Sequence, residues 1–191
     1  MNQPVPKSDW RRELRSRWQS LSDEERSVGA VLICRRLKEQ ACWQQARTVL
    51  LFAPLPDEVN LWPLLEDALA EGKNVALPRH DPAQKHYVAS PVINLQRDLS
   101  TGAFGIREPA SHCQKIDLST VDLALVPGVG FDLNGNRLGR GKGFYDRLLA
   151  DLGGIKCGVA LDEQITEILP TEGHDVQMDL VLTGTRIVWR K

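Results

Sequence analysis

The chain contains 191 residues, of which 42% are hydrophobic and 26% are charged, and its formal net charge at pH 7 is −1. This size and composition are typical of one globular domain around a hydrophobic core, so a single domain is expected over residues 1–191. The near-neutral charge argues against a protein that binds nucleic acid or membrane surfaces through a general electrostatic field. No apolar run approaches the roughly 18 residues of a membrane span. Any cationic function is therefore expected to be local.

The cellular location is predicted from the N-terminal residues and the cysteines. The first residues are polar and lack the apolar core of a signal peptide. The four cysteines, Cys34, Cys42, Cys113 and Cys157, show no C-x-x-C spacing, which argues against a zinc or thioredoxin-type site. We therefore expect a reduced, cytoplasmic protein. A monomer is the default expectation, and the sequence leaves the oligomeric state open.

The N-terminal part of the chain is predicted to be helical. A short helix is expected over residues 10–20, and a longer one over residues 20–43 that begins with a capping box of Ser22 and Glu25. Its apolar residues at roughly helical spacing are Val28, Val31, Leu32 and Leu37.

Strands and helices alternate from residue 47 onward. The expected strands are 47–53, 74–80, 86–93, 121–127, 156–161 and 179–189, the last as one strand or a hairpin. The expected helices are 61–72, 144–154 and 163–169, the first capped by Asn60, with Pro63 in its first turn and Gly72 as its end. Residues 101–110 are expected to form a turn-rich loop. This alternation predicts a mainly parallel α/β sheet covered on both faces.

Ligands of such sheets bind beyond the carboxyl ends of the strands, where loops lead into helices. Two loops occupy this position, residues 53–60 and residues 127–143. The second ends in a run of glycines and cations: Gly135, Gly139, Gly141, Gly143, Arg137, Arg140 and Lys142. Glycine permits positive φ angles and close backbone approach, and successive N–H groups together with cations bind anions. The loop is therefore predicted to bind phosphate groups rather than to be a solvated turn.

Neither of the two commonest phosphate-binding motifs is present in this loop. A Walker A motif would need glycine where Asn136 stands, and Ser or Thr where Gly143 stands. A dinucleotide fingerprint that began at Gly139 would need glycine in place of Phe144.

The stretch PGVGFDLNGNRLGRGKGFYDRLL, residues 127–149, resembles the signature of the 5-formyltetrahydrofolate cyclo-ligase family. Residues 7–26 are similar to the basic N-terminal helix of this family, residues 57–59 to its substrate loop, and residues 102–109 to its G-x-x-G-I-x-E-P segment. The resemblance implies a three-layer α/β/α sandwich. It also implies conversion of 5-formyltetrahydrofolate to 5,10-methenyltetrahydrofolate in one-carbon metabolism, with ATP as co-substrate, Mg²⁺ as cofactor, a phosphorylated formyl intermediate, and ADP and phosphate as further products.

The resemblance assigns site residues by position. Expected ATP-binding residues are Lys7, Arg11, Arg137, Leu138, Gly139, Arg140, Gly141, Lys142, Gly143, Phe144 and Tyr145. Arg140 and Lys142 are expected to be catalytic. Expected folate-binding residues are Ala53, Glu58, Arg140, Gly141, Lys142, Gly143 and Phe144. Expected Mg²⁺ ligands are Asp146 and Asp175, with Asp179 as the alternative to Asp175.

The chain departs from the family pattern at a few positions. Phe144 stands where Tyr or Trp is common, and Asn60 and Leu61 replace an acidic residue and a threonine. These departures affect details of the folate pocket rather than the reaction class. No histidine shows metal-ligand spacing, so none is assigned to catalysis. The five tryptophans are expected in packing, with pterin stacking by one of them left open.

Simpler interpretations of single residues also exist. Asp146 could only stabilise a helix start, Glu58 could only cap a helix, and the basic N-terminal helix could be a solvated face. Two other functions stay open for the chain as a whole: a sugar-phosphate isomerase of the same α/β class, and a non-catalytic nucleotide- or RNA-binding module. A metal-suited acid beside the cationic loop argues against the isomerase. The near-zero net charge argues against the RNA-binding module.

Overall fold

The computed structural model describes residues 5–82, 86–102 and 105–190. A seven-stranded sheet forms its centre, in the order β12-β11-β9-β6-β1-β2-β3. These strands are Ile187–Trp189, Leu180–Leu182, Ile155–Val159, Leu123–Pro127, Thr48–Leu50, Asn74–Asp81 and His86–Val92. The five inner strands run parallel, and the two outermost strands are antiparallel to their neighbours. The predicted mainly parallel α/β sheet is thus confirmed. Within the described residues, no helix combines the length and the apolar character that crossing a membrane requires.

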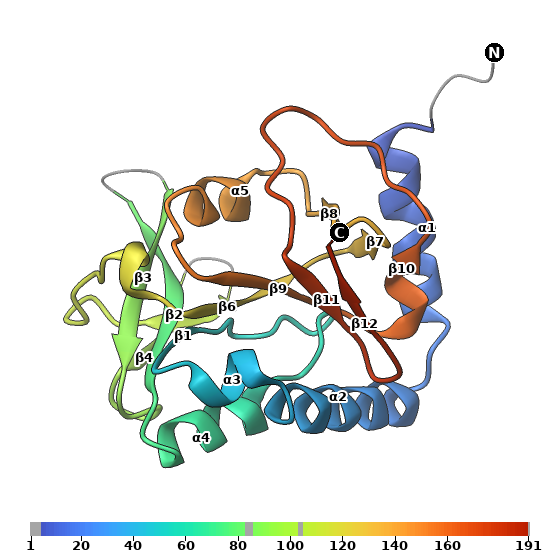
Figure 1. The fold of residues 1–191 in the computed structure, drawn as a ribbon. Helices are drawn as coiled ribbons and strands as arrows, with labels where there is room; N and C mark the ends of the chain where they lie inside the picture. The colour runs from blue at the N-terminus through green and yellow to red at the C-terminus, as the bar shows by residue number, and fades with distance from the viewer. Residues whose placement is uncertain (1–4, 83–85, 103–104, 191) are drawn as a thin grey trace.

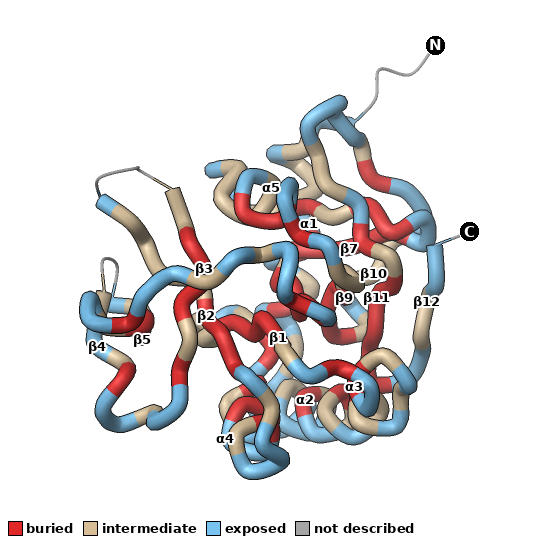
Figure 2. The backbone as a smooth tube through the Cα atoms, turned by 60° about the vertical axis from the view of Figure 1, so that its left-hand side comes forward, coloured by how far each residue is buried: buried red, intermediate tan, exposed pale blue. Residues whose placement is uncertain are grey.

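Helices cover both faces of this sheet (Figure 1). One face carries α2 (Asp23–Lys38), α3 (Ala41–Gln45) and α4 (Trp62–Ala70), and the other carries α5 (Phe144–Leu149). Side chains of β6 alternate between the two layers, because successive residues of a strand point to opposite faces. Leu123 and Leu125 pack with the helical layer of α2–α4, whereas Ala124 and Val126 pack with α5. All four are almost fully buried, and Figure 2 shows burial concentrated in the central strands.

A second, three-stranded sheet extends from the carboxyl end of β6. It consists of β7 (Gly130–Asp132), β8 (Arg137–Leu138) and β10 (Ile165–Thr166). Fully buried Asp132 forms its turn: Oδ1 accepts hydrogen bonds from the N–H groups of Asn134 and Asn136, both at 2.9 Å. A buried carboxylate that accepts several N–H groups holds a turn rigidly. The turn therefore returns the chain so that β8 leads directly into the glycine-rich loop.

Helix α1 (Lys7–Gln19) packs on this second sheet. Fully buried Leu14 lies over Gly130, where a Cβ atom would come within 2.4 Å of a Leu14 methyl carbon. Glycine at position 130 therefore lets the helix approach the sheet closely. This contact holds the start of α1, with its basic side chains, beside the carboxyl ends of the central strands.

Several predicted helix features are confirmed. Ser22 and Glu25 form the capping box of α2, with the Glu25 carboxylate 2.7 Å from the Ser22 N–H. Pro63 lies in the first turn of α4, and Gly72 follows the helix with a φ of +77°. The predicted cap of α4 was wrong by one position: Leu61 is the N-cap residue and makes no side-chain cap hydrogen bond, while Asn60, one residue earlier, accepts a hydrogen bond from the Trp62 N–H at 3.1 Å.

Other helix predictions were wrong. The helix expected over residues 20–43 is interrupted between α2 and α3. The buried stripe of α2 is Ala30, Ile33 and Leu37, while Val28 and Val31 are exposed. Apolar residues lie at helical spacing on two faces of α2, and tertiary packing determines which of these faces is buried. The helix expected over residues 163–169 is instead a 3₁₀ turn, Asp162–Gln164, followed by β10.

The loop expected over residues 101–110 contains part of a hairpin, β4 (Leu99–Thr101) with β5 (Arg107–Pro109). Residues 103 and 104 of that prediction lie outside the described residues. Strands of only three residues are too short to show a clear alternation of apolar and polar residues. The glycines and prolines of this segment therefore led to the prediction of a loop.

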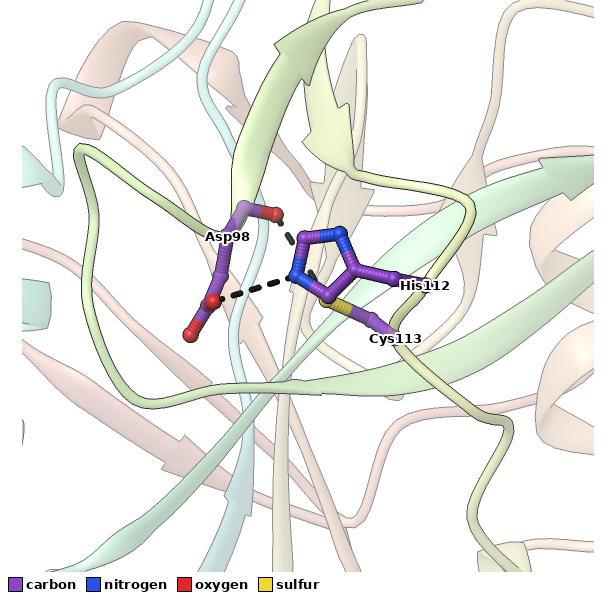
Figure 3. Close-up of side chains that lie close together, drawn as sticks. All are labelled: Asp98, His112 and Cys113. Carbon is purple, nitrogen blue, oxygen red and sulfur yellow. Dashed lines mark hydrogen bonds and ion pairs between the residues drawn. The ribbon is translucent and has the colours of Figure 1, made fainter.

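Buried Asp98 anchors this hairpin beside the main sheet (Figure 3). Its carboxylate accepts hydrogen bonds from the N–H groups of Ile93 and Asn94, both at 2.9 Å, and from Arg97 Nε at 2.6 Å. His112 Nε2 lies 3.3 Å from the same carboxylate, and Cys113 Sγ contacts the Asp98 carbonyl oxygen. The three side chains are types that bind metals. However, this carboxylate already has several donors, one of them a cation, which accounts for the cluster as a structural anchor.

We expect Asp98→Asn to lower the free energy of unfolding by about 1–3 kcal/mol, because it removes charge-assisted hydrogen bonds from a buried group. Arg97 and the Asn94 N–H hold the pKa of Asp98 well below its ordinary value. Asp98 therefore stabilises the protein at neutral pH, and this contribution is lost as pH falls below about 4. Urea unfolding at pH 7 and at pH 3.5 measures both effects.

The matched control is Asp151→Asn, because Asp151 is exposed. It should leave unfolding unchanged at pH 7. Equal stability of Asp98→Asn and the wild type at pH 7 would contradict the anchor.

Candidate functional site

A cavity of about 500 Å³ lies beyond the carboxyl ends of β1, β2 and β6. It is lined by the two predicted ligand loops, the start of α1, the hairpin β4–β5 and the start of α5. The site residues predicted from the sequence that line it are Lys7, Arg11, Ala53, Glu58, Arg137, Leu138, Gly139, Arg140, Gly141, Lys142, Gly143, Phe144, Tyr145, Asp146 and Asp175. Folding thus gathers side chains from positions 7 to 175 around one space.

The glycine-rich loop takes a conformation that other residues rarely adopt. Gly141 has a φ of +93°, and Gly143, the residue before α5, has a φ of +62°. A side chain at either position would be strained, and a Cβ atom at Gly139 would lie 2.8 Å from the Arg137 guanidinium. Glycine is therefore required here by backbone geometry and by the space that Arg137 occupies.

Arg140 joins this loop to the other ligand loop. Its Nη2 atom lies 2.6 Å from Asp57 Oδ1 and 3.2 Å from Glu58 Oε1. Glu58 is largely buried, and its other oxygen accepts a hydrogen bond from the Leu55 N–H at 3.0 Å. Burial raises the pKa of Glu58 above its ordinary value, although the Leu55 N–H and Arg140 favour the ionised form.

Arg137 and Asp146 form a second ion pair at the same cavity. Arg137 Nη2 donates to Asp146 Oδ1 at 2.8 Å, and the side chains are only 5% and 17% exposed. The guanidinium also lies over the Tyr145 ring, 5.5 Å from its centroid. Its buried Nε atom lacks a hydrogen-bond partner among the described residues. An Arg with unused donor capacity in a cavity is well suited to bind an anion.

Lys7 brings the N-terminal helix into the site. Its Nζ atom lies 2.7 Å from Asp175 Oδ2, and the neighbouring Arg11 donates from Nε to the Gly139 carbonyl at 2.8 Å. Burial alone would raise the pKa of Asp175, but hydrogen bonds from Lys7 and from the Glu172 N–H outweigh it, so the pKa is lowered. Asp175 is therefore a stable anion at neutral pH.

The two candidate second metal ligands lie in different places. Asp175 lines the cavity with Asp146, whereas Asp179 immediately precedes β11, at the amino end of that parallel strand. Asp179 Oδ2 accepts from the Lys156 N–H at 2.8 Å, and Oδ1 lies 3.6 Å from Arg190. The amino ends of parallel strands lie at the opposite edge of the sheet from the cavity. Asp146 and Asp175 are thus the predicted pair that shares one space, and each already holds a cationic group.

Sequence reasoning missed several residues that line the cavity: Pro78, Tyr87, Ile106, Arg107, Glu108, Glu172 and His174. Ile106, Arg107 and Glu108 belong to the quoted G-x-x-G-I-x-E-P segment, so a signal existed for them. Tyr87 and His174 stand in stretches without any motif.

The aromatic residues that line the cavity are not the tryptophans, one of which the sequence left open as a stacking partner for a pterin. Within the described part of the chain, no tryptophan lines this cavity, whereas Tyr87 and Phe144 do. Their ring centroids lie 5.0 Å apart at an interplanar angle of 68°. Trp43 is buried in the core and Trp62 lies under Arg107, 4.7 Å from its guanidinium carbon. Packing thus accounts for both tryptophans.

Comparisons with known proteins agree with this geometry. The model of the 5-formyltetrahydrofolate cyclo-ligase family matches residues 4–184. The 5-formyltetrahydrofolate cyclo-ligase of Mus musculus is 32% identical over 186 residues, which cover 90% of each chain. The protein of that name from Haemophilus influenzae is 32% identical over 177 residues, covering 91% of this chain and 93% of the relative.

A solved structure of similar fold is the 5,10-methenyltetrahydrofolate synthetase of Aquifex aeolicus. It has a TM-score of 0.87 and 34% identity, and the match covers 97% of this chain and 93% of that one. The family match spans the main sheet except β12, both predicted ligand loops and all the cavity residues described above. The chain therefore belongs to the 5-formyltetrahydrofolate cyclo-ligase family and is an enzyme.

Proposed function

We propose that the protein converts 5-formyltetrahydrofolate to 5,10-methenyltetrahydrofolate, with ATP as phosphoryl donor and Mg²⁺ as cofactor. The observation that supports this best is the charge arrangement of one cavity. Lys7 and Arg11 reach it from α1 and Arg137 reaches it from β8, and two carboxylates that could hold a metal ion line the same cavity. Such an arrangement suits a nucleotide triphosphate bound with a divalent cation.

The chemistry requires activation of an amide oxygen. The formyl oxygen attacks the γ-phosphorus, the bond from that phosphorus to the β–γ bridging oxygen breaks, and ADP leaves. The folate N10 then attacks the formyl carbon and loses its proton, and the former formyl oxygen departs with inorganic phosphate. Phosphorylation is needed because the oxygen of an amide is otherwise a very poor leaving group.

The residues of the chain supply positioning and positive charge for this transfer. Arg140 and Lys142 both line the cavity on the glycine-rich loop, and we place them where the γ-phosphate and the formyl group meet. Phosphoryl transfer depends mainly on orientation and on neutralising charge, so these cations would stabilise the transition state. Mg²⁺, held by Asp146 and Asp175, would supply further neutralisation of the phosphate oxygens.

The ion pairs of the ligand-free site suggest how substrates are admitted. Lys7, Arg137 and Arg140 contact carboxylates that are proposed to hold the metal or the folate. Phosphate groups would attract the same cations away, because they carry more charge. The exchange would release Asp146 and Asp175 for a metal ion and Glu58 for the folate. ATP, metal and folate are therefore expected to favour one another's binding.

The other two functions are less well supported. An isomerase would need no pair of metal-suited carboxylates beside its phosphate site. An RNA-binding module would need a broad basic face, whereas the cations of this chain line an enclosed space and pair with acids. Free cysteines fit a reduced environment, and the location in the cytoplasm, the role in one-carbon metabolism and the monomeric state remain predictions.

Mixing the protein with 5-formyltetrahydrofolate and Mg-ATP should produce the near-ultraviolet absorbance of the methenyl product, with stoichiometric ADP. The reaction should stop when either ATP or Mg²⁺ is left out. Absorbance that rises equally without ATP, or no rise with all components present, would contradict the proposed reaction.

Lys142→Ala should lower kcat by about 100-fold or more, the magnitude typical for removal of a group that stabilises transition-state charge. Lys142 is exposed, so the melting temperature should stay the same. Lys115→Ala is the control, because Lys115 is also exposed and does not line the cavity within the described residues. Near-normal turnover of Lys142→Ala would remove this residue from the proposed catalytic pair.

Glu58→Gln should raise the KM for 5-formyltetrahydrofolate by about tenfold and leave the KM for ATP within about twofold. A carboxylate accepts hydrogen bonds from ring N–H and amino groups, and an amide replaces one acceptor with a donor. Steady-state kinetics with each substrate varied in turn tests this. A changed KM for ATP with an unchanged KM for folate would place Glu58 at the other substrate.

A further inference from the structure

Glu108 is a second buried carboxylate at this cavity. It lies on β5, its side chain lines the cavity, and the residue is 5% exposed. Its Oε2 atom accepts a hydrogen bond from the His80 N–H at 3.0 Å. Its Oε1 atom lies 3.5 Å from the Tyr87 hydroxyl, which is a weak contact. One good hydrogen bond is few for a buried carboxylate.

The other acids of the cavity differ from Glu108 in their partners. Glu58, Asp146 and Asp175 each lie within 4.0 Å of an Arg or Lys nitrogen. Glu172 lies 3.4 Å from Lys7. No such cation is paired with Glu108 in the part of the chain that the structure describes. A buried carboxylate is costly unless its acceptor sites are filled, and it can accept about four hydrogen bonds. Glu108 therefore has unused acceptor capacity beside the cavity.

The residues around Glu108 indicate what kind of ligand could bind to it. A Cβ atom at Gly102 would lie 2.7 Å from its carboxyl carbon, so glycine keeps this space for the carboxylate. Tyr87, which contacts Glu108, packs edge-to-face against Phe144 at the end of the glycine-rich loop. An acceptor beside an aromatic wall fits a flat ring that carries N–H donors on its edge.

We propose that Glu108 binds the N–H donors of the substrate's pterin ring, as a second acceptor alongside Glu58. This inference rests on the proposed function. A reduced pterin offers donors on two neighbouring edges: N3–H with the 2-amino group, which the proposed function gives to Glu58, and N8–H, which this inference gives to Glu108. Glu58 reaches the cavity from the loop after β1 and Glu108 from the hairpin, so the proposed ring contacts two separate segments of the chain. Glu108 selects rings by their donors and takes no part in phosphoryl transfer.

The test is direct binding of 5-formyltetrahydrofolate by titration calorimetry, together with steady-state kinetics. Glu108→Gln should raise Kd and KM for the folate about tenfold, with the KM for ATP and the melting temperature unchanged. Gly102→Ala keeps the charge but displaces the carboxylate, so it should weaken folate binding in the same way. Glu163→Gln, at an exposed position, is the matched control and should bind like the wild type.

A ligand analogue separates recognition from a structural role. A 5-formyltetrahydrofolate analogue with a CH₂ group in place of N8–H should bind the wild type about tenfold more weakly. Glu108→Gln should show little further loss with this analogue, because the contact is already missing. Equal additional loss for both ligands would mean that Glu108 only anchors the hairpin to β2, and would overturn the inference.

Failure of the two proposals can be told apart. A wild type that binds folate and turns it over, together with a Glu108→Gln variant of equal affinity, would overturn the role of Glu108 alone. A wild type that neither binds nor converts 5-formyltetrahydrofolate would overturn both. If Glu108→Gln melts at a lower temperature, the Gly102→Ala titration with the two ligands decides the outcome.

Discussion

Opposite charges from distant parts of the chain meet in one cavity and neutralise one another, and the rest of the site depends on this. Lys7 reaches Asp175, Arg137 reaches Asp146, and Arg140 reaches Glu58. Taking a charge out of water is costly, so each of these side chains needs a partner when no ligand is present. The pairs keep the cations and the carboxylates oriented toward the same space. Under the proposed function, a nucleotide together with its metal ion would replace these internal partners without leaving a bare buried charge.

Parallel strands bring these partners together. The loops that follow β1 and β6 leave the sheet at the same edge, because the carboxyl ends of parallel strands lie together. The second sheet adds a return turn, fixed by Asp132, that directs Arg137 into the cavity. Helix α1 closes the arrangement from outside, since Gly130 lets Leu14 pack tightly on that sheet. The geometry of the site is therefore a consequence of backbone packing that joins the glycine-rich stretch to segments elsewhere in the chain.

Buried acids perform two different tasks in this molecule. Asp98 and Asp132 accept several backbone N–H groups and so hold a hairpin and a turn in place. Asp146 and Asp175 line the cavity and pair there with cationic side chains, and Glu108 lines it with mainly neutral partners. Asp98 and Asp132 lie away from the cavity lining, and their backbone hydrogen bonds give them a structural role. These acids of the cavity are those that the proposed roles assign to ligands.

The sequence alone determined the class of the sheet, the positions of the two ligand loops and most of the cavity residues. Alternating apolar strands and helices are local patterns, and the glycine-rich loop needs its residues whatever surrounds it, because Gly141 and Gly143 adopt positive φ angles. Tertiary structure alone decided which apolar stripe of α2 is buried, which of Asp175 and Asp179 lies in the cavity, and that Tyr87 joins it. These outcomes depend on contacts between segments far apart in the chain, and no local pattern records which segments will meet.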